Sequence, residues 1–196
     1  MPVLAIANQK GGVGKTTTAV NLSAALARAQ RRVLLIDCDP QSNATSNLGE
    51  TPGAAASIYD VFAERVSIRS CVRSTQVPGL SLVPSSPELA GGEIELATAQ
   101  QREFRLRGAV AELADSYDYV LLDCSPSLGL LTLNALTAAS GVLIPVQCEY
   151  MALEGLTHLT TTISLVQAQL NPALTVAGLI LTMYDARTNL AQAVVE

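Results

Sequence analysis

The chain has 196 residues, of which 49% are apolar and 4% aromatic, and its formal net charge is −5 at neutral pH. A chain of this length can bury a substantial core and most simply forms one domain over residues 1–196. The core must be mainly aliphatic, and the acidic balance argues against a protein that coats nucleic acid with its whole surface. A local basic patch stays open.

The four cysteines form no C-x-x-C pair, and no signal-peptide pattern precedes the first apolar run; they are Cys38, Cys71, Cys124 and Cys148. We therefore expect reduced thiols and a cytoplasmic protein. Cys38 and Cys124 each follow an aspartate at the end of an expected strand and could come near each other. A metal or redox role is the alternative to simple burial.

The first expected elements are a strand over residues 3–7, a glycine-rich loop, and a helix over residues 17–29. Glycines leave room for the backbone to fold around a phosphate chain, and the helix aims its unpaired amides at the same anion. Lys15 supplies positive charge to the outer phosphates, and Thr16 supplies a hydroxyl ligand for magnesium. The glycines in question are Gly11, Gly12 and Gly14.

This loop departs from the strict pattern G-x-x-x-x-G-K-[ST] at Gln9, where glycine is required. It has a second lysine, Lys10, just before the glycines. Lys10 and Lys15 are the only lysines among twelve basic residues, so both look chemically required. The alternative, a glycine turn with two chance lysines, is the weaker interpretation because further motifs follow at fitting positions.

Two later apolar runs end in aspartates. Residues 33–36 lead into Asp37 and Asp39, and residues 119–122 lead into Asp123. The carboxyl ends of parallel strands form the edge where open α/β sheets bind ligands, so we expect these carboxylates beside the loop. Asp39 could instead be a turn or N-cap carboxylate before Pro40.

Strand and helix alternate through the remainder, which implies a mostly parallel sheet covered on both faces. We expect one long helix over residues 93–114, whose Arg102, Arg105 and Arg107 form a solvated face or contact DNA or a partner. Two uncharged stretches, residues 124–148 and 155–184, are interrupted by polar residues and proline. We interpret each as a buried helix followed by a buried strand, and we expect no membrane contact.

Three segments resemble the ParA/Soj partition ATPases of the ParA/MinD group, which carry a deviant Walker A loop: residues 10–17, 37–44 and 123–131. Residues 145–156 and 183–189 are similar as well. The resemblance implies an α/β, three-layer P-loop NTPase fold with a twisted, mostly parallel sheet and helices on both faces. It implies ATP or ADP and Mg²⁺ as ligands. It also implies a further strand and helix after residue 196, with much of the adenine pocket.

Hydrolysis of a phosphoanhydride needs a bridging metal, for which Thr16 and Asp123 are the candidate ligands, Asp123 either directly or through a water. The resemblance assigns Asp39 to positioning the attacking water and Asp37 to the magnesium shell. Lys15 and, from the partner of an ATP-bound homodimer, Lys10 would complete a catalytic set with Asp39. Hydrolysis to ADP and phosphate would then be slow in the monomer. The nucleotide would be bound by Lys10, Gly11, Gly12, Val13, Gly14, Lys15, Thr16 and Thr17.

The resemblance also implies partners. In ParA-like proteins the ATP-bound dimer binds DNA without sequence preference, and a ParB-like centromere-binding protein stimulates hydrolysis. We expect a nucleoid-associated protein, with Arg187 as the DNA contact; pairing with Asp185 is the alternative. Dimer or switch contacts would come from Lys10, Gly11, Glu149, Tyr150 and Glu154, although a plain helix N-terminus explains the glutamates as well.

Other functions remain open at this point. A MinD-like or other cargo-positioning ATPase would share the first loop, and so would a nucleotide-locked binding module that hardly hydrolyses. A small-molecule kinase would need an acceptor pocket with its own acid or base, for which the sequence offers no independent candidate. A cluster-binding relative of the nitrogenase iron protein finds little support in the cysteine spacing.

Overall fold

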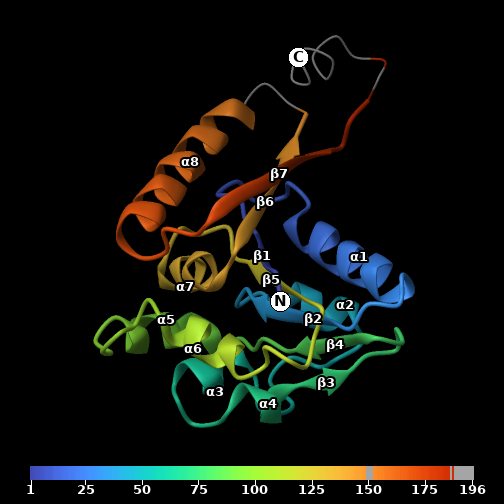
Figure 1. Cartoon of the computed structure of the whole chain (residues 1–196), viewed down its shortest axis with the longest axis vertical. Helices are drawn as coiled ribbons and strands as arrows, with labels where there is room; N and C mark the ends of the chain where they lie inside the picture. Colours follow the sequence, from blue (N-terminus) through green and yellow to red (C-terminus); the bar gives the residue numbers. More distant parts are fainter. Residues whose placement is uncertain (149–151, 186, 188–196) are drawn as a thin grey trace.

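The computed structural model describes residues 1–148, 152–185 and 187, with the side chains of 152–154 left out of the description. Its centre is a seven-stranded sheet in the order β3-β4-β2-β5-β1-β6-β7 (Figure 1). Every pairing in that order is parallel except β3 with β4, which is antiparallel. The strands are β1 (Val3–Ile6), β2 (Val33–Cys38), β3 (Arg73–Ser74), β4 (Leu80–Val83), β5 (Tyr119–Cys124), β6 (Gly141–Gln147) and β7 (Thr175–Thr182).

Helices cover both faces of the sheet, as expected from strands that are apolar at consecutive positions. Successive side chains of β2 alternate between the two faces: Leu34 and Ile36 pack with α3, α5, α6, α7 and α8, whereas Val33 and Leu35 pack with α1 and α2. The helices are α1 (Lys15–Arg28), α2 (Asn43–Asn47), α3 (Ile58–Phe62), α4 (Ile68–Cys71), α5 (Leu89–Leu96), α6 (Arg105–Ala111), α7 (Leu130–Ala138) and α8 (Ala152–Gln169). The predicted α/β class with a mostly parallel sheet is confirmed.

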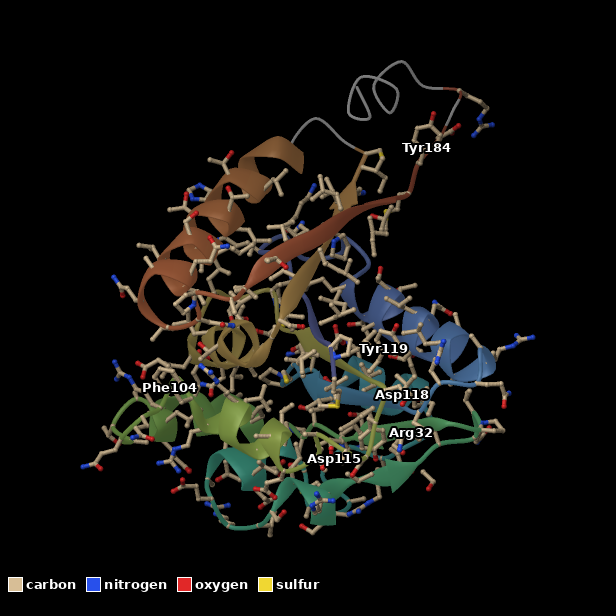
Figure 2. All side chains as sticks on the ribbon, viewed as in Figure 1. Arg32, Phe104, Asp115, Asp118, Tyr119 and Tyr184 are labelled. Atoms are coloured by element: carbon tan, nitrogen blue, oxygen red, sulfur yellow. The ribbon has the colours of Figure 1, made fainter. Side chains whose placement is uncertain are left out.

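An ion pair lies where β2 and β5 begin. The Arg32 backbone N–H donates to Asp118 Oδ2 at 2.8 Å, and its guanidinium donates to Asp118 Oδ1 at 2.8 Å (Figure 2). The Arg32 side chain is 59% exposed and that of Asp118 is 32% exposed, so solvent screens the pair and it contributes little to stability. Its geometry fits the strand register, in which Val33 lies opposite Tyr119.

The prediction of one long helix over residues 93–114 is wrong, because the chain breaks into α5 and α6. Buried Asn134 of α7 accounts for the break: its Oδ1 accepts from Leu106 N at 3.1 Å, and its Nδ2 donates to the Arg102 carbonyl at 2.7 Å. One amide side chain thus satisfies backbone groups that a continuous helix would have paired internally. Leu96 and Leu106 can then both be buried in the same core cluster. The antiparallel edge strand β3 and helix α4 were also not predicted.

Both uncharged stretches form a helix followed by a strand: α7 with β6, and α8 with β7. The first pair is largely buried, as predicted. The prediction of a buried strand is wrong for β7, which lies at the edge of the sheet and whose residues are all exposed or half-buried. In the part of the chain that the structure describes, no helix combines the length and the apolar character that a membrane span requires.

Replacing Asn134 with alanine should lower the free energy of unfolding by about 2–3 kcal/mol, because buried backbone groups lose their partners. Urea denaturation measures this. Asn21→Ala is the matched control: its amide bonds the Thr17 carbonyl on an exposed face, and its effect should stay within about 0.5 kcal/mol. Equal effects for the two variants would contradict our explanation of the helix break.

Candidate functional site

The glycine loop joins β1 to α1 at the carboxyl edge of the sheet. Gly12 and Gly14 have φ of +76° and +88°, a backbone region that side chains disfavour. Buried Asn8 fixes the start of the loop: its Nδ2 donates to the Pro145 carbonyl at 2.7 Å, and its Oδ1 accepts from Lys10 N at 3.0 Å. The loop is therefore tied to β6 as well as to β1. Sequence reasoning did not identify Asn8 as an anchor.

Lys15 is the first residue of α1, and its side chain is 7% exposed. Its Nζ donates to the Lys10 carbonyl at 3.0 Å, so the ammonium lies against the loop. Burial lowers the pKa of Lys15, while Asp123 and Asp39 favour the charged form. A buried cation held over a loop of backbone amides is suited to binding an anion.

Two carboxylates lie side by side at this edge. Asp37 of β2 and Asp123 of β5 are register partners, and β1 places Ile6 opposite Asp123. Both aspartates are fully buried. The structure thus brings two of the predicted residues together beside the loop.

Neither carboxylate oxygen of Asp123 accepts a hydrogen bond from the described residues. Burial raises its pKa to about 8, and Asp37 adds to the rise; Thr16 and Lys15 act in the opposite direction. The Thr16 hydroxyl is thus close enough to favour the charged form, but it lies outside hydrogen-bonding geometry. A buried carboxylate with both oxygens unpartnered is costly unless a cation binds it.

The surroundings of Asp37 are the reverse. Its Oδ2 accepts from Thr45 N at 2.8 Å and from Thr45 Oγ1 at 2.7 Å, and its Oδ1 accepts from Asp39 N at 3.2 Å. Burial raises the pKa of Asp37 to about 6, and these hydrogen bonds limit the rise. Thr45 Oγ1 also accepts from Ser85 N at 2.9 Å. Asp37 therefore organises the backbone around Asp39, and its oxygens are already in use.

Asp39 is 6% exposed and follows β2 directly. Its Oδ1 accepts from Gln41 N at 2.9 Å, and its carbonyl accepts from Ser85 Oγ at 2.7 Å. The bond to the residue two positions on is an Asx turn, which the sequence offered as the alternative to a catalytic role. Asp39 makes that turn contact at the mouth of the site, and its role towards water stays a prediction.

Strand β7 supports the loop from the side. Thr182 Oγ1 donates to the Val13 carbonyl at 2.9 Å, and a Cβ on Gly14 would lie 3.5 Å from Thr182 Cγ2. No local pattern signalled this residue, because the contact joins positions 169 residues apart.

The remaining predicted residues lie elsewhere. Arg187 is exposed and pairs with Asp185, with Nη2 and Oδ2 2.6 Å apart; its DNA contact stays a prediction. Glu149 and Tyr150 lie outside the described residues, and so does the side chain of Glu154.

The thiols Cys38 and Cys124 are register partners, as the sequence suggested. Burial raises the pKa of both thiols, so they stay protonated and unreactive at neutral pH. The burial interpretation of these two cysteines fits their surroundings.

Comparisons with known proteins agree with this geometry. A family model described as "AAA domain" matches residues 1–176. The chromosome partitioning protein ParA of Myxococcus xanthus is 54% identical over 195 residues, which cover 99% of this chain and 69% of that protein. The sporulation initiation inhibitor protein Soj of Bacillus subtilis is 52% identical, covering 99% of this chain and 77% of Soj.

Solved structures match the fold closely. A Mycobacterium smegmatis protein named cobyrinic acid a,c-diamide synthase, with bound ATP analog and magnesium, has a TM-score of 0.96 and 44% identity over 100% of this chain and 80% of that one. A plasmid partition protein from Borrelia burgdorferi has a TM-score of 0.85 and 30% identity, covering 98% and 82%. The predicted P-loop fold is thus confirmed.

Thr45→Val keeps the shape of the side chain but removes the hydroxyl between Asp37 and Ser85. The buried Ser85 N–H loses its acceptor and Asp37 loses a donor, so the free energy of unfolding should fall by about 1–3 kcal/mol. Thr160→Val on the exposed face of α8 is the matched control and should change it by less than about 0.5 kcal/mol. Urea denaturation of both variants measures these changes. If Thr45→Val were as stable as Thr160→Val, the Thr45 hydroxyl would not support Asp37 and Ser85 as described.

Asp123→Asn should change how stability depends on pH in the protein free of nucleotide and metal. The pKa of Asp123 is about 8 in the folded protein and its ordinary value is 3.8. Between pH 3.8 and about 8, the folded protein therefore holds a proton on Asp123 that the unfolded chain has lost. Wild-type stability should therefore fall relative to Asp123→Asn as pH rises through that window, and the difference should level off above it. Denaturation in the presence of EDTA at several pH values tests this. If the difference in unfolding free energy between wild type and Asp123→Asn did not change with pH, burial would not raise the pKa of Asp123.

Proposed function

We propose that this chain, which belongs to the ParA/Soj family of partition ATPases, binds ATP with Mg²⁺ at the glycine loop and hydrolyses it to time a cycle of DNA segregation. One observation supports the proposal most strongly: Asp123 lies beside the glycine loop, and its buried carboxylate has no hydrogen-bond partner among the described residues. The chain spans 69% and 77% of the lengths of the ParA and Soj relatives.

The loop and α1 supply what a nucleotide triphosphate requires. Backbone amides of residues 10–17 and the helix N-terminus would hold the phosphates, with Lys15 as the point charge. The orphaned oxygens of Asp123 fit a magnesium ion, with the Thr16 hydroxyl beside them. When bound, the ion neutralises charge on the outer phosphates.

The two aspartates of β2 would have separate tasks. Asp37, whose oxygens are occupied by Thr45 and Asp39, would reach the metal only through water and would keep Asp39 in place. Asp39 would orient the attacking water beside the terminal phosphate. Its turn contact with Gln41 uses one oxygen and holds the carboxyl group in one orientation.

Completion of the site would need a second subunit. Lys10 precedes the glycines at the surface of the loop, and its carbonyl already holds Lys15. Its side chain would neutralise transition-state charge on the nucleotide of a partner subunit, so turnover would be slow until two ATP-bound chains associate. DNA without sequence preference and a ParB-like protein would be the other partners, and a nucleoid location would follow.

The Mycobacterium smegmatis relative bears the name of a different activity, that of a diamide synthase. The relatives with higher identity carry partition names, and we therefore favour partition. A MinD-like cargo-positioning ATPase or a nucleotide-locked module with negligible hydrolysis remain the functional alternatives.

Three variants test the proposal by ATP turnover and by mass photometry with ATP or ADP. Asp39→Ala should lower turnover by about 100-fold or more while ATP-dependent dimers persist. Lys10→Ala should lower turnover on the order of 10³-fold, because the cation that completes the partner's site is lost. Arg28→Ala, exposed at the far end of α1, is the control and should behave as wild type. Full turnover in Lys10→Ala would contradict the shared site.

DNA retention separates partition from the alternatives. Non-specific duplex DNA should retain the protein with ATP but not with ADP, and binding should weaken steeply as salt rises. ATP turnover without DNA retention in either state would instead favour another cargo.

A further inference from the structure

Helix α7 follows the segment that leads away from Asp123, and its N-terminus is capped from a different helix. The first amide of α7, Leu130 N, donates to Glu93 Oε1 of α5 at 2.6 Å. The residue just before a helix often caps it through a Ser, Thr, Asp or Asn side chain, as Ser57 does for α3 and Ser67 for α4. Here the cap position is Gly129, which has no side chain with which to do so. Glu93 takes that role across the helix interface.

Gly129 is the counterpart of this contact. Its φ is −85°, a value that any residue adopts, so the backbone itself does not call for glycine. A Cβ at this position, however, would overlap the carboxylate of Glu93. A side chain at position 129 would therefore displace the Glu93 carboxylate from the cap.

Two hydroxyl contacts lie within this segment. Ser125 and Ser127 share a hydrogen bond between hydroxyls at 2.9 Å, and Thr132 Oγ1 donates to the Ser127 carbonyl at 2.6 Å. These bonds shape residues 125–132. Buried Leu131 packs α7 into the core, and Asn134 Nδ2 donates to the Leu130 carbonyl. Glu93 adds the contact that joins the first amide of α7 to α5.

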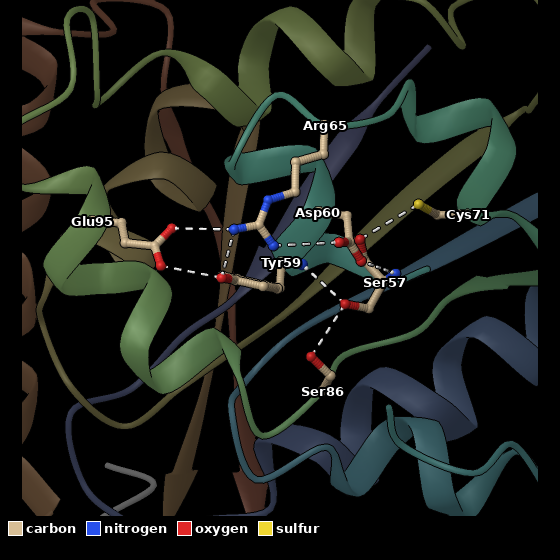
Figure 3. A network of polar contacts seen from close by, with 7 residues as sticks. All are labelled: Ser57, Tyr59, Asp60, Arg65, Cys71, Ser86 and Glu95. Atoms are coloured by element: carbon tan, nitrogen blue, oxygen red, sulfur yellow. Dashed lines mark hydrogen bonds and ion pairs between the residues drawn. The ribbon is translucent and has the colours of Figure 1, made fainter. Parts of the chain in front are cut away.

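Helix α5 is itself held firmly. Gly92 lies against Tyr59 of α3, where a Cβ would come within 2.8 Å of the ring. The Tyr59 hydroxyl donates to Glu95 Oε1 at 3.1 Å and accepts from Arg65 at 3.0 Å, and Arg65 stacks on the Tyr59 ring at 4.7 Å (Figure 3). Glu93 therefore projects from a helix that side-chain contacts join to α3.

Helix α3 is joined in turn to the end of β4. Ser57 Oγ donates to Ser86 Oγ at 3.2 Å (Figure 3). Ile58 N donates to the Pro84 carbonyl at 2.9 Å. Ser85 lies between Pro84 and Ser86, and its backbone N–H donates to Thr45 Oγ1. Thr45 Oγ1 in turn donates to Asp37. The segment after Asp123 and the segment after Asp37 are thus linked outside the sheet through α3 and α5.

We propose that Glu93 is a positioning residue for ATP turnover: by capping α7 it holds residues 125–129, which join β5 to α7, in the position that hydrolysis requires. The proposal rests on the ATPase function proposed above. Glu93 does not touch the nucleotide loop, so nucleotide affinity should depend little on it, whereas the rate of the chemical step should.

Four variants test the proposal through kcat and KM for ATP. Glu93→Ala and Gly129→Ala should each lower kcat about fivefold, the equivalent of one lost helix cap, with KM changed less than about twofold. Glu93→Gln keeps the acceptor oxygen and should retain most activity. The double variant Glu93→Ala/Gly129→Ala should fall no further than either single variant, because both remove the same contact. Gly91→Ala on α5, where a Cβ meets nothing within 4 Å, is the matched control.

Amide exchange of Leu130, read without nucleotide, supplies a measurement independent of activity. It should quicken in Glu93→Ala and in Gly129→Ala, and stay slow in Glu93→Gln and Gly91→Ala. Unchanged exchange in Glu93→Ala, wild-type kcat in that variant, or additive losses in the double variant would each overturn the proposal. A wild-type chain that hydrolyses no ATP contradicts the ATPase function instead, and the exchange of Leu130 then still decides whether Glu93 fixes this segment.

Discussion

The pairing of β2 with β5 sets Asp37 directly against Asp123 at a buried edge of the sheet, and the rest of the site depends on that register. Two buried carboxylates so close cannot both stay ionised without compensation. The protein separates them by surroundings: Asp37 receives three hydrogen bonds, and Asp123 receives none from the described residues. Asp37 thus bonds Thr45 and the backbone of Asp39, while Asp123 keeps both oxygens free of partners among the described residues, and we propose that a cation binds there.

Much of this site could be predicted from local sequence, because its elements have short-range signatures. The glycine loop lies between an apolar run and a helical run, and an aspartate at the end of an apolar run reaches the carboxyl edge of a parallel sheet. Those two rules place Lys15, Asp37 and Asp123 at one edge. They do not distinguish the two aspartates, since burial and hydrogen bonding decide which carboxylate is free.

The residues that sequence reasoning missed act over long separations. Thr182 meets the loop from the last described strand, and Glu93 caps a helix that begins 37 residues later. Asn134 ends the predicted long helix by bonding backbone groups 28 and 32 residues away. A polar residue within an apolar run, such as Asn134, indicates that its side chain is buried. The sequence does not reveal which distant backbone groups it bonds. Such contacts follow from tertiary packing, which a one-dimensional pattern does not encode.

Our central proposal is that Asp123, and not Asp37, would bind the metal directly. The Mg²⁺ concentration dependence of ADP affinity, measured by calorimetry in wild type, Asp123→Asn and Asp37→Asn, tests it most directly. We expect Asp123→Asn to lose most of the gain in affinity that Mg²⁺ confers and to keep metal-free binding, while Asp37→Asn keeps a Mg²⁺ response near that of wild type. An unchanged Mg²⁺ response in Asp123→Asn, or a loss confined to Asp37→Asn, would contradict the account.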